Sequence, residues 1–188
     1  MATRREFLLA GGSTLAGLAL PPWVVPAAGR GAIPSEPGSG AAAEIRMRSD
    51  ALGGRVGFDP IGIRVAPGTT VRWVLEAGAH SATAYHPANA DHAPRIPPDA
   101  EPWDSGILTR PGQSFELRLD VPGVYDYFCL PHELAGMVGR IVVEERGGKG
   151  LPEPAPVSEG FRPVPAAALA AFPAIEEIRR AGIVRLAP

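Results

Sequence analysis

The chain is predicted to fold as an all-β protein, a Greek-key β-sandwich with one domain. Seven short runs between residues 44 and 144 are apolar or alternate between apolar and polar residues, a pattern typical of strands. The pairs Pro67-Gly68, Pro111-Gly112 and Pro122-Gly123 lie between such runs. They favour type II turns, because proline fixes φ at about −65° and glycine tolerates positive φ. With 188 residues, 45% of them hydrophobic, the chain is long enough for one core but not for two large domains.

The predicted strands cover residues 44–48, 61–65, 70–76, 81–85, 114–119, 123–129 and 138–144. The segment from Tyr85 to Leu108 is rich in proline, which cannot donate a hydrogen bond to a neighbouring strand. We therefore expect a surface excursion at one end of the sandwich. Tyr125 follows a Pro-Gly turn and resembles the tyrosine corner of Greek-key sandwiches, which indicates a structural role.

Residues 1–30 are predicted to be an export signal of the twin-arginine type. Arg4 and Arg5 precede a modestly apolar run from Phe7 to Leu20, and small residues follow at positions 27–29. The alternative is an uncleaved membrane anchor, because residues 7–28 could just span a hydrocarbon layer of about 30 Å. Three glycines and three prolines in that stretch argue against an anchor. The signal predicts a periplasmic or otherwise extracytoplasmic protein.

Two further segments flank the predicted domain, which covers residues 44–146. Residues 31–43 are rich in proline, glycine, serine and alanine and are predicted to be a flexible linker. Residues 147–188 are predicted to be a Pro/Gly linker and a helical extension, which Pro173 divides into two pieces. The apolar residues that we expect to pack on the sandwich lie near helical spacing at Leu169, Phe172, Ile175, Ile178 and Ile183.

The charge and the cysteine content restrict the function. A formal net charge of −2 and a pI of about 6.1 argue against a nucleic-acid partner, since proteins that bind nucleic acids have clustered basic surfaces. Cys129 is the only cysteine, so an intramolecular disulfide is excluded. A lone cysteine is most often a buried structural thiol, but an exported thiol is better explained when a metal occupies its sulfur.

Three side chains suited to copper lie in one short loop between two predicted strands. Cys129, His132 and Met137 combine a thiolate, an imidazole and a thioether, a mixed soft set that suits copper cycling between Cu(I) and Cu(II). A trigonal site needs one more imidazole from another strand, and His80 lies at the junction of two predicted strands. Taken alone, His80 would be a turn histidine and Met137 a core residue. Together the four residues predict a metal site.

From about Arg55 to Glu145 the sequence resembles a cupredoxin of the plastocyanin kind. The resemblance rests on residues 63–73, His80-Ser81, residues 122–125, and the loop Cys-Leu-Pro-His followed by Ala-Gly-Met-Val-Gly. It implies one type 1 (blue) copper ion, with Cys129 as the thiolate ligand, His80 and His132 as the imidazoles and Met137 as the long axial ligand. It also implies an electron carrier and not an enzyme.

The sequence departs from the family pattern in two respects. Plastocyanins usually have asparagine at the positions occupied here by Leu75 and Ser81, and the second of these asparagines ties the ligand loops together. We expect the Ser81 hydroxyl to form a hydrogen bond across the site instead. Phe128 replaces the surface tyrosine that commonly precedes the ligand cysteine, so an electron route through that phenol is missing.

The remaining polar candidates are interpreted as structural. His86 and His92 lie in the excursion near Asp91, where a second metal site is conceivable, but a solvated loop histidine is the more common case. Asp104-Ser105-Gly106 contains a serine that no motif links to a histidine, and we interpret it as a turn.

We expect an exported monomer that transfers one electron at a time between redox protein partners docking near His132. The surrounding patch is predicted to be apolar, with Glu133 as its only charge. One alternative function is periplasmic copper storage or copper delivery as a chaperone. Another is a copper oxidase or nitrite reductase, which would need a second domain or more histidines than the four present. We expect no nucleic-acid partner and no stable membrane insertion of the mature domain.

Overall fold

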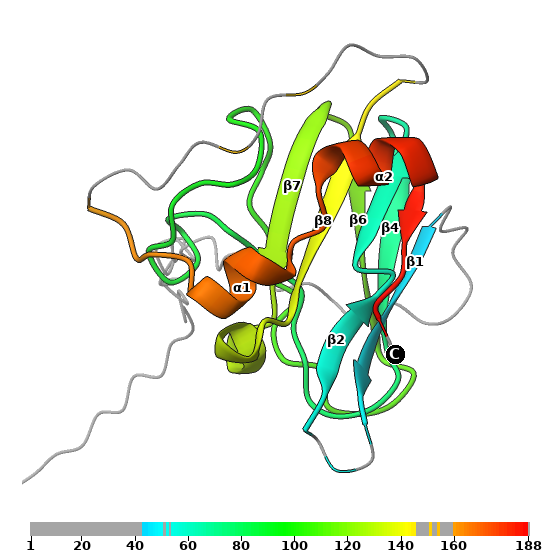
Figure 1. Cartoon of the computed structure of the whole chain (residues 1–188), viewed down its shortest axis with the longest axis vertical. Helices are drawn as coiled ribbons and strands as arrows, with labels where there is room; N and C mark the ends of the chain where they lie inside the picture. The colour runs from blue at the N-terminus through cyan, green and yellow to red at the C-terminus, as the bar shows by residue number, and fades with distance from the viewer. Residues whose placement is uncertain are drawn as a thin grey trace, which may run out of the picture. The chain divides into compact units, whose positions relative to one another are not determined.

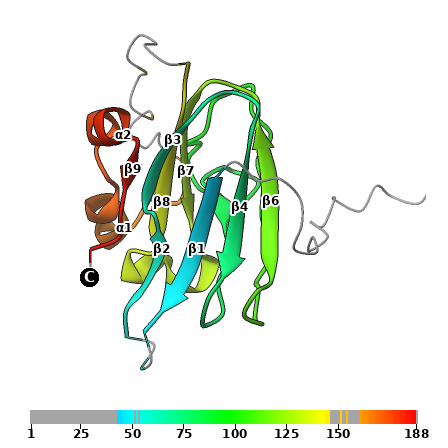
Figure 2. The same ribbon diagram turned by 90° about the vertical axis from the view of Figure 1, so that its right-hand side faces the viewer.

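Two β-sheets stack face to face in the computed structural model (Figures 1 and 2). The structure describes residues 43–50, 52, 54–145, 151, 154 and 160–187. The first sheet has the order β2-β1-β4-β6 and the second β5-β7-β8-β3-β9, with parallel pairing of β1 with β4 and of β3 with β8. The strands of the first sheet are β1 (Ala43–Ser49), β2 (Val56–Asp59), β4 (Thr69–Leu75) and β6 (Ser114–Leu119); those of the second are β3 (Gly62–Val65), β5 (Thr83–Ala84), β7 (Gly123–Phe128), β8 (Val138–Val143) and β9 (Ile183–Val184).

The predicted all-β sandwich with a short helical C-terminal extension is confirmed. The predictions for residues 1–30 and for most of the linker that follows fall outside the described residues. In the described part of the chain, no helix has the length and apolar character needed to cross a membrane.

The first sheet forms strands because its sequence alternates with a period of two. In β4, Val71, Trp73 and Leu75 are buried, while the residues between them are only partly covered. Trp73 lies at the centre of an aromatic core, with its ring 5.7 Å from Phe115 and 5.4 Å from Tyr127 between centroids. Burial of these large side chains between the sheets is the main driving force for the sandwich.

The outer face of the second sheet is covered by the C-terminal extension, which explains why all six residues of β8 are buried (Figure 2). The extension contains the helices α1 (Ala166–Ala171) and α2 (Ile175–Ala181), and Pro173 lies between them, as predicted. Ile175 and Ile178 pack with Val142 on this face. The strand β9 then adds to the edge of the sheet beside β3.

A buried ionic cluster also holds the extension on the sheet. Asp126 on β7 is fully buried and accepts hydrogen bonds from Arg95 and Arg140. Both guanidinium groups lie over the Phe172 ring, at 5.3 and 5.0 Å from its centroid, and Arg140 donates to the Pro173 carbonyl at 3.0 Å. The charge cluster therefore joins the excursion, the sheet and the extension.

Several predicted details are wrong. The run 81–85 forms a strand only at Thr83–Ala84, and β2 and β9 were not predicted. Ile175 and Ile178 of the expected apolar stripe are buried, as predicted, but Leu169 is exposed by 47% because α1 buries Ala168 instead. Ile183 is exposed by 51% because it belongs to the edge strand β9 and not to a helix. The excursion between Tyr85 and Leu108 is not confined to the surface, since it contributes Trp103 to the main core.

Tyr125 has the structural role expected of a tyrosine corner. Its hydroxyl donates a hydrogen bond of 2.6 Å to the carbonyl of Val121, four residues upstream. This contact fixes the chain where it enters β7, the strand that leads directly into the predicted copper loop.

Gly139→Ala is expected to destabilise the fold by about 1–3 kcal/mol. Gly139 pairs with Tyr127 across β7 and β8, and an added Cβ would collide with the Tyr127 hydroxyl and ring in the fully buried core. Urea unfolding measures the effect. Gly54→Ala is the matched control, because the nearest atom to its Cβ would be 3.9 Å away, and we expect a change within about 0.5 kcal/mol. Equal stability of the two variants would contradict the packing described here.

Candidate metal centre

The predicted ligand loop connects β7 to β8 at one end of the sandwich. It contains a short 3₁₀ helix, η1 (Leu130–Ala135), which ends at Gly136 in the left-handed conformation with φ of 78°. Three backbone hydrogen bonds close the loop: Cys129 N to Met137 O at 3.0 Å, His132 N to Cys129 O at 3.0 Å, and Met137 N to His132 O at 3.1 Å. The backbone therefore holds Cys129, His132 and Met137 near one another.

Three donor atoms meet at this end of the sandwich. The Nδ1 atoms of His80 and His132 lie 3.1 Å apart, and the Cys129 Sγ lies 3.5 Å from the first and 3.4 Å from the second. His80 reaches the site from the connection between β4 and β5, whereas the other two belong to the ligand loop. Two separate parts of the fold thus fix the arrangement.

The spacing of these donors fits a single small ion. In metal sites of proteins, nitrogen lies about 2.0–2.1 Å and sulfur about 2.3 Å from the metal. In one plane around an ion, two such nitrogens are separated by roughly 3.5 Å and a nitrogen and a sulfur by roughly 3.8 Å, by trigonal geometry from those bond lengths. The observed separations of 3.1–3.5 Å are within about 0.5 Å of these values. A thiol with two imidazoles suits copper.

Met137 completes the predicted set on the buried side of the loop. Its side chain is fully buried in the same core cluster as Cys129, and both of its backbone hydrogen bonds go to the ligand loop. A thioether held there is suited to a weak axial contact, and it also packs in the core.

Burial shifts the pKa values of the three donor side chains. Desolvation, with the nearby His132, lowers the pKa of His80 to about 4, and burial also lowers the pKa of His132. Both imidazoles are therefore neutral at neutral pH and have lone pairs available. Burial raises the pKa of the Cys129 thiol to about 11, although hydrogen bonds from the Ser81 and His132 backbones oppose the shift. Metal binding must consequently displace the thiol proton.

Ser81 joins the two halves of the site, as expected for this position. Its backbone N–H points at the Cys129 Sγ at 3.4 Å, and its hydroxyl accepts a hydrogen bond of 2.9 Å from the Leu130 N–H. The hydroxyl also contacts Thr83 Oγ1 at 2.9 Å, and Thr83 in turn donates to Asp104 Oδ1 at 2.9 Å. Because the Thr83 hydroxyl donates its proton to Asp104, it must accept the hydrogen bond from Ser81. The two hydrogen bonds therefore run in one direction, from Ser81 through Thr83 to Asp104.

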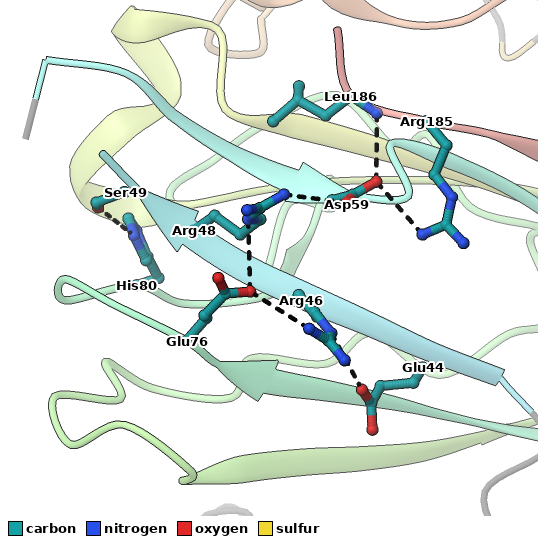
Figure 3. Close-up of polar contacts among 9 residues, drawn as sticks. All are labelled: Glu44, Arg46, Arg48, Ser49, Asp59, Glu76, His80, Arg185 and Leu186. Carbon is teal, nitrogen blue, oxygen red and sulfur yellow. Dashed lines mark hydrogen bonds and ion pairs between the residues drawn. The ribbon is translucent and has the colours of Figure 1, made fainter. Parts of the chain in front are cut away.

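Two residues that hold the ligands and their neighbours in place were not predicted from the sequence. Asp104, interpreted only as part of a turn, also accepts the hydrogen bond of Thr83. Ser49 at the end of β1 places its hydroxyl 2.8 Å from His80 Nε2, as Figure 3 shows. This contact fixes the His80 ring with Nδ1 facing the other donors. In the sequence, Ser49 is marked only by its position at the end of a strand, and it lies 31 residues before His80.

His86 and His92 do not join the donor cluster. His86 is partly exposed, and its ring accepts a hydrogen bond from Ala88 N at 3.2 Å. The interpretation of His92 as a solvated histidine is wrong, because it is fully buried against Tyr85 and Phe128. Within the described part of the chain, the possible metal cluster consists of His80, Cys129 and His132.

The expected position of Glu133 is also wrong. We predicted it as the one charge on the surface beside His132, but its side chain is only 2% exposed and points into the protein. Leu134, its neighbour, is 77% exposed. The loop therefore presents an apolar surface and keeps its carboxylate inside.

Phe128, which replaces the surface tyrosine of the family pattern, is also buried. It is buried beneath Tyr85, whose ring centroid lies 4.5 Å away, and it packs with Val138 and Ala168. The C-terminal extension thus closes the flank of the site next to Cys129, and the partly exposed His132 remains at the surface of the loop.

Comparison with known proteins agrees with this geometry. A family model described as copper binding proteins of the plastocyanin/azurin family matches residues 45–144. A chloroplastic plastocyanin from Tetradesmus obliquus is 33% identical over 104 residues, which are 55% of this chain and 68% of that protein. A plastocyanin from Prochlorothrix hollandica is 30% identical over 122 residues, 64% of this chain and 87% of that protein.

A solved pseudoazurin structure from Sinorhizobium meliltoi is 29% identical and covers 73% of this chain and 92% of its own, with a TM-score of 0.46. Because the family match spans more than half of the sequence and includes the whole donor cluster, the chain belongs to the plastocyanin/azurin family of copper-binding, electron-transferring proteins, with copper as its cofactor.

Proposed function

We propose that this protein is an exported one-electron carrier whose type 1 copper is held by His80, Cys129 and His132, with Met137 as the axial ligand. The observation that carries the proposal is the meeting of three donor atoms at 3.1–3.5 Å from one another, on two separate parts of a buried scaffold. Copper bound there would supply one-electron redox chemistry by alternating between Cu(I) and Cu(II).

The chain's own contribution is to keep the donors in place. Ser49 orients the His80 ring, Ser81 links the ligand loop to the His80 connection, and the loop closes on its own backbone. A donor set that is already arranged before the metal binds needs little rearrangement when the charge of the site changes. This favours rapid outer-sphere transfer, in which no substrate is bound and no bond is made.

We place the docking surface for redox partners around His132. The exposed residues of the ligand loop are uncharged, namely Leu130, Pro131, Leu134 and Ala135, and Gly78 and Ala79 beside His80 are also exposed and uncharged. The inward position of Glu133 makes this patch more apolar than the sequence predicted. Association through such a patch depends weakly on salt, since salt screens charges and not apolar burial.

Leu134→Lys is expected to slow electron transfer to a redox partner by about tenfold or more. The substitution puts a charge at the most exposed apolar position of the loop, where docking must remove water. Stopped-flow rates measured across ionic strength would test this, with Ile183→Lys as a control at an exposed apolar position on β9, at the edge of the second sheet. Unchanged rates for Leu134→Lys, or a steep salt dependence for the wild type, would place docking elsewhere.

The alternative is a copper store or chaperone, which would use similar ligands. The buried thiol and the hydrogen bonds around it favour retention of the metal and thus the carrier. Slow copper exchange with a reversible potential would support the carrier. Rapid transfer of Cu(I) to an acceptor protein would support the chaperone.

An extracytoplasmic location is part of the proposal. It is supported by Arg4-Arg5 ahead of the apolar run and by the lone cysteine, which a metal would protect in an oxidising compartment. Replacement of both arginines by lysine is expected to leave the precursor in the cytoplasm, as cell fractionation would show. Normal export of this double variant would argue for another route.

A further inference from the structure

Glu133 is a buried carboxylate directly after His132, and the mechanism of electron transfer gives it no role. Its Oε1 accepts a hydrogen bond of 3.0 Å from the Tyr85 hydroxyl and lies 3.3 Å from His92 Nε2. Its Oε2 accepts a hydrogen bond of 3.0 Å from Arg162 Nη2. The three partners belong to the excursion and to the C-terminal extension, so one side chain of the ligand loop joins both segments.

The chemistry of the partners suits a buried carboxylate. An unpaired buried carboxylate is strongly unfavourable, whereas one with a cation and further hydrogen-bond donors is tolerated. Burial, followed by the charge of Glu133, raises the pKa of Tyr85 above its ordinary value, so the phenol keeps its proton and donates it. Burial lowers the pKa of His92, which is therefore neutral at neutral pH. Of the three partners, Arg162 supplies the positive charge.

Arg162 is itself held against the excursion. Its backbone N–H donates to the Asp91 carbonyl at 2.9 Å, and Arg162 forms a parallel β-bridge with His92. The chain then enters α1, which packs on η1. At Gly136, an added Cβ would lie 3.1 Å from the Ala167 carbonyl. The extension therefore contacts the ligand loop at both Glu133 and Gly136.

These contacts bear directly on the position of His132. The 3₁₀ segment is short, and its backbone departs from helical geometry at His132, where φ is −126° and ψ is 16°. A rotation of this segment would move the imidazole away from Cys129. Because Glu133 is tied on the opposite side of the backbone from the exposed Leu134, such a rotation would break the Tyr85 and Arg162 contacts.

We propose that Glu133 anchors the ligand loop, and that Arg162 of the C-terminal extension and Tyr85 of the excursion thereby position His132 for copper. The extension is thus a part of the metal site's support and not only a cover for the sheet. This inference rests on the proposed ligand set, because it assigns the anchor to the residue beside a copper ligand.

The test compares Arg162→Ala, Tyr85→Phe and the conservative Arg162→Lys with the wild type and with Arg180→Ala. Arg180 is an exposed arginine of α2, a helix that contacts β3 and β8. Two readouts are needed. Amide hydrogen exchange of residues 130–137 in the metal-free protein reports the loop itself. The reduction potential and the rate of copper loss to a chelator report the loaded site.

We expect Arg162→Ala to accelerate exchange in the loop and copper loss by about tenfold each, as for removal of one hydrogen bond to a buried charge. Tyr85→Phe should act in the same direction, Arg162→Lys should restore part of the loss, and Arg180→Ala should match the wild type. A shift in potential together with faster loop exchange would support positioning.

Unchanged loop exchange in both Arg162→Ala and Tyr85→Phe would overturn the anchor, as would a general loss of stability with an unaltered potential and copper-loss rate. Failure of the proposed function has a different signature, since the wild type would then lack a copper-thiolate absorption band while the loop exchange could still respond to Arg162→Ala.

Discussion

Cys129→Ser is expected to abolish the intense visible absorption of the copper-loaded protein. The band of a blue copper site arises from charge transfer between the thiolate sulfur and copper, and a serine hydroxyl does not supply it. Copper affinity should also fall, by more than the roughly 10–100-fold typical for loss of an outer-shell partner. Titration with copper followed by visible spectroscopy would measure both effects.

The fold itself should survive this substitution. Cys129 is fully buried, but serine is close to it in size, and the backbone hydrogen bonds that close the loop remain possible. Far-ultraviolet circular dichroism checks this point. His86→Asn is the matched control, because it removes a histidine outside the donor cluster and should leave the band intact. A strong visible band in Cys129→Ser would show that another residue holds the copper.

Asp126→Asn is expected to lower the free energy of unfolding by about 3–5 kcal/mol. Asp126 is fully buried and receives hydrogen bonds from both Arg95 and Arg140. The amide keeps the shape of the side chain but removes the charge, and its NH₂ group faces a donor. The asparagine oxygen can still accept a hydrogen bond, but both buried guanidinium groups lose the negative charge that neutralises them.

The matched control for this variant is Asp120→Asn. Asp120 forms an ion pair of 2.8 Å with Arg118 on the surface, where both side chains are more than 60% exposed. Removal of such a pair changes stability by less than about 1 kcal/mol. Chemical denaturation of both variants gives the comparison. Similar small losses for the two would mean that the Asp126 cluster is no more important than a surface pair.

The parts of the structure that were predicted from the sequence depend on local patterns. Runs that are apolar or that alternate between apolar and polar residues placed β1, β4, β6, β7 and β8 to within a few residues. The ligand loop was equally visible, because three of its chemically distinctive residues lie within nine positions of the chain. Pro173 marked the division of the helical extension, since proline cannot continue a helix.

The parts that were missed depend on packing between distant segments. Ser49 and His80 meet only because β1 runs parallel to β4, and nothing in either local sequence indicates that pairing. Glu133 was expected at the surface, since a lone carboxylate in a loop is usually solvated. Its burial requires Tyr85 and Arg162, which lie 48 and 29 residues away in the sequence.

The two-residue strand β9 has a consequence for association between molecules. Without it, β3 would end the second sheet with four residues whose backbone groups could pair with another chain. Exposed strand edges of this kind are common starting points for aggregation, and very short edge strands are one natural protection against it. By adding Ile183–Val184 to β3, the C-terminal extension leaves a two-residue strand at this margin, which offers a neighbouring copy little backbone to pair with.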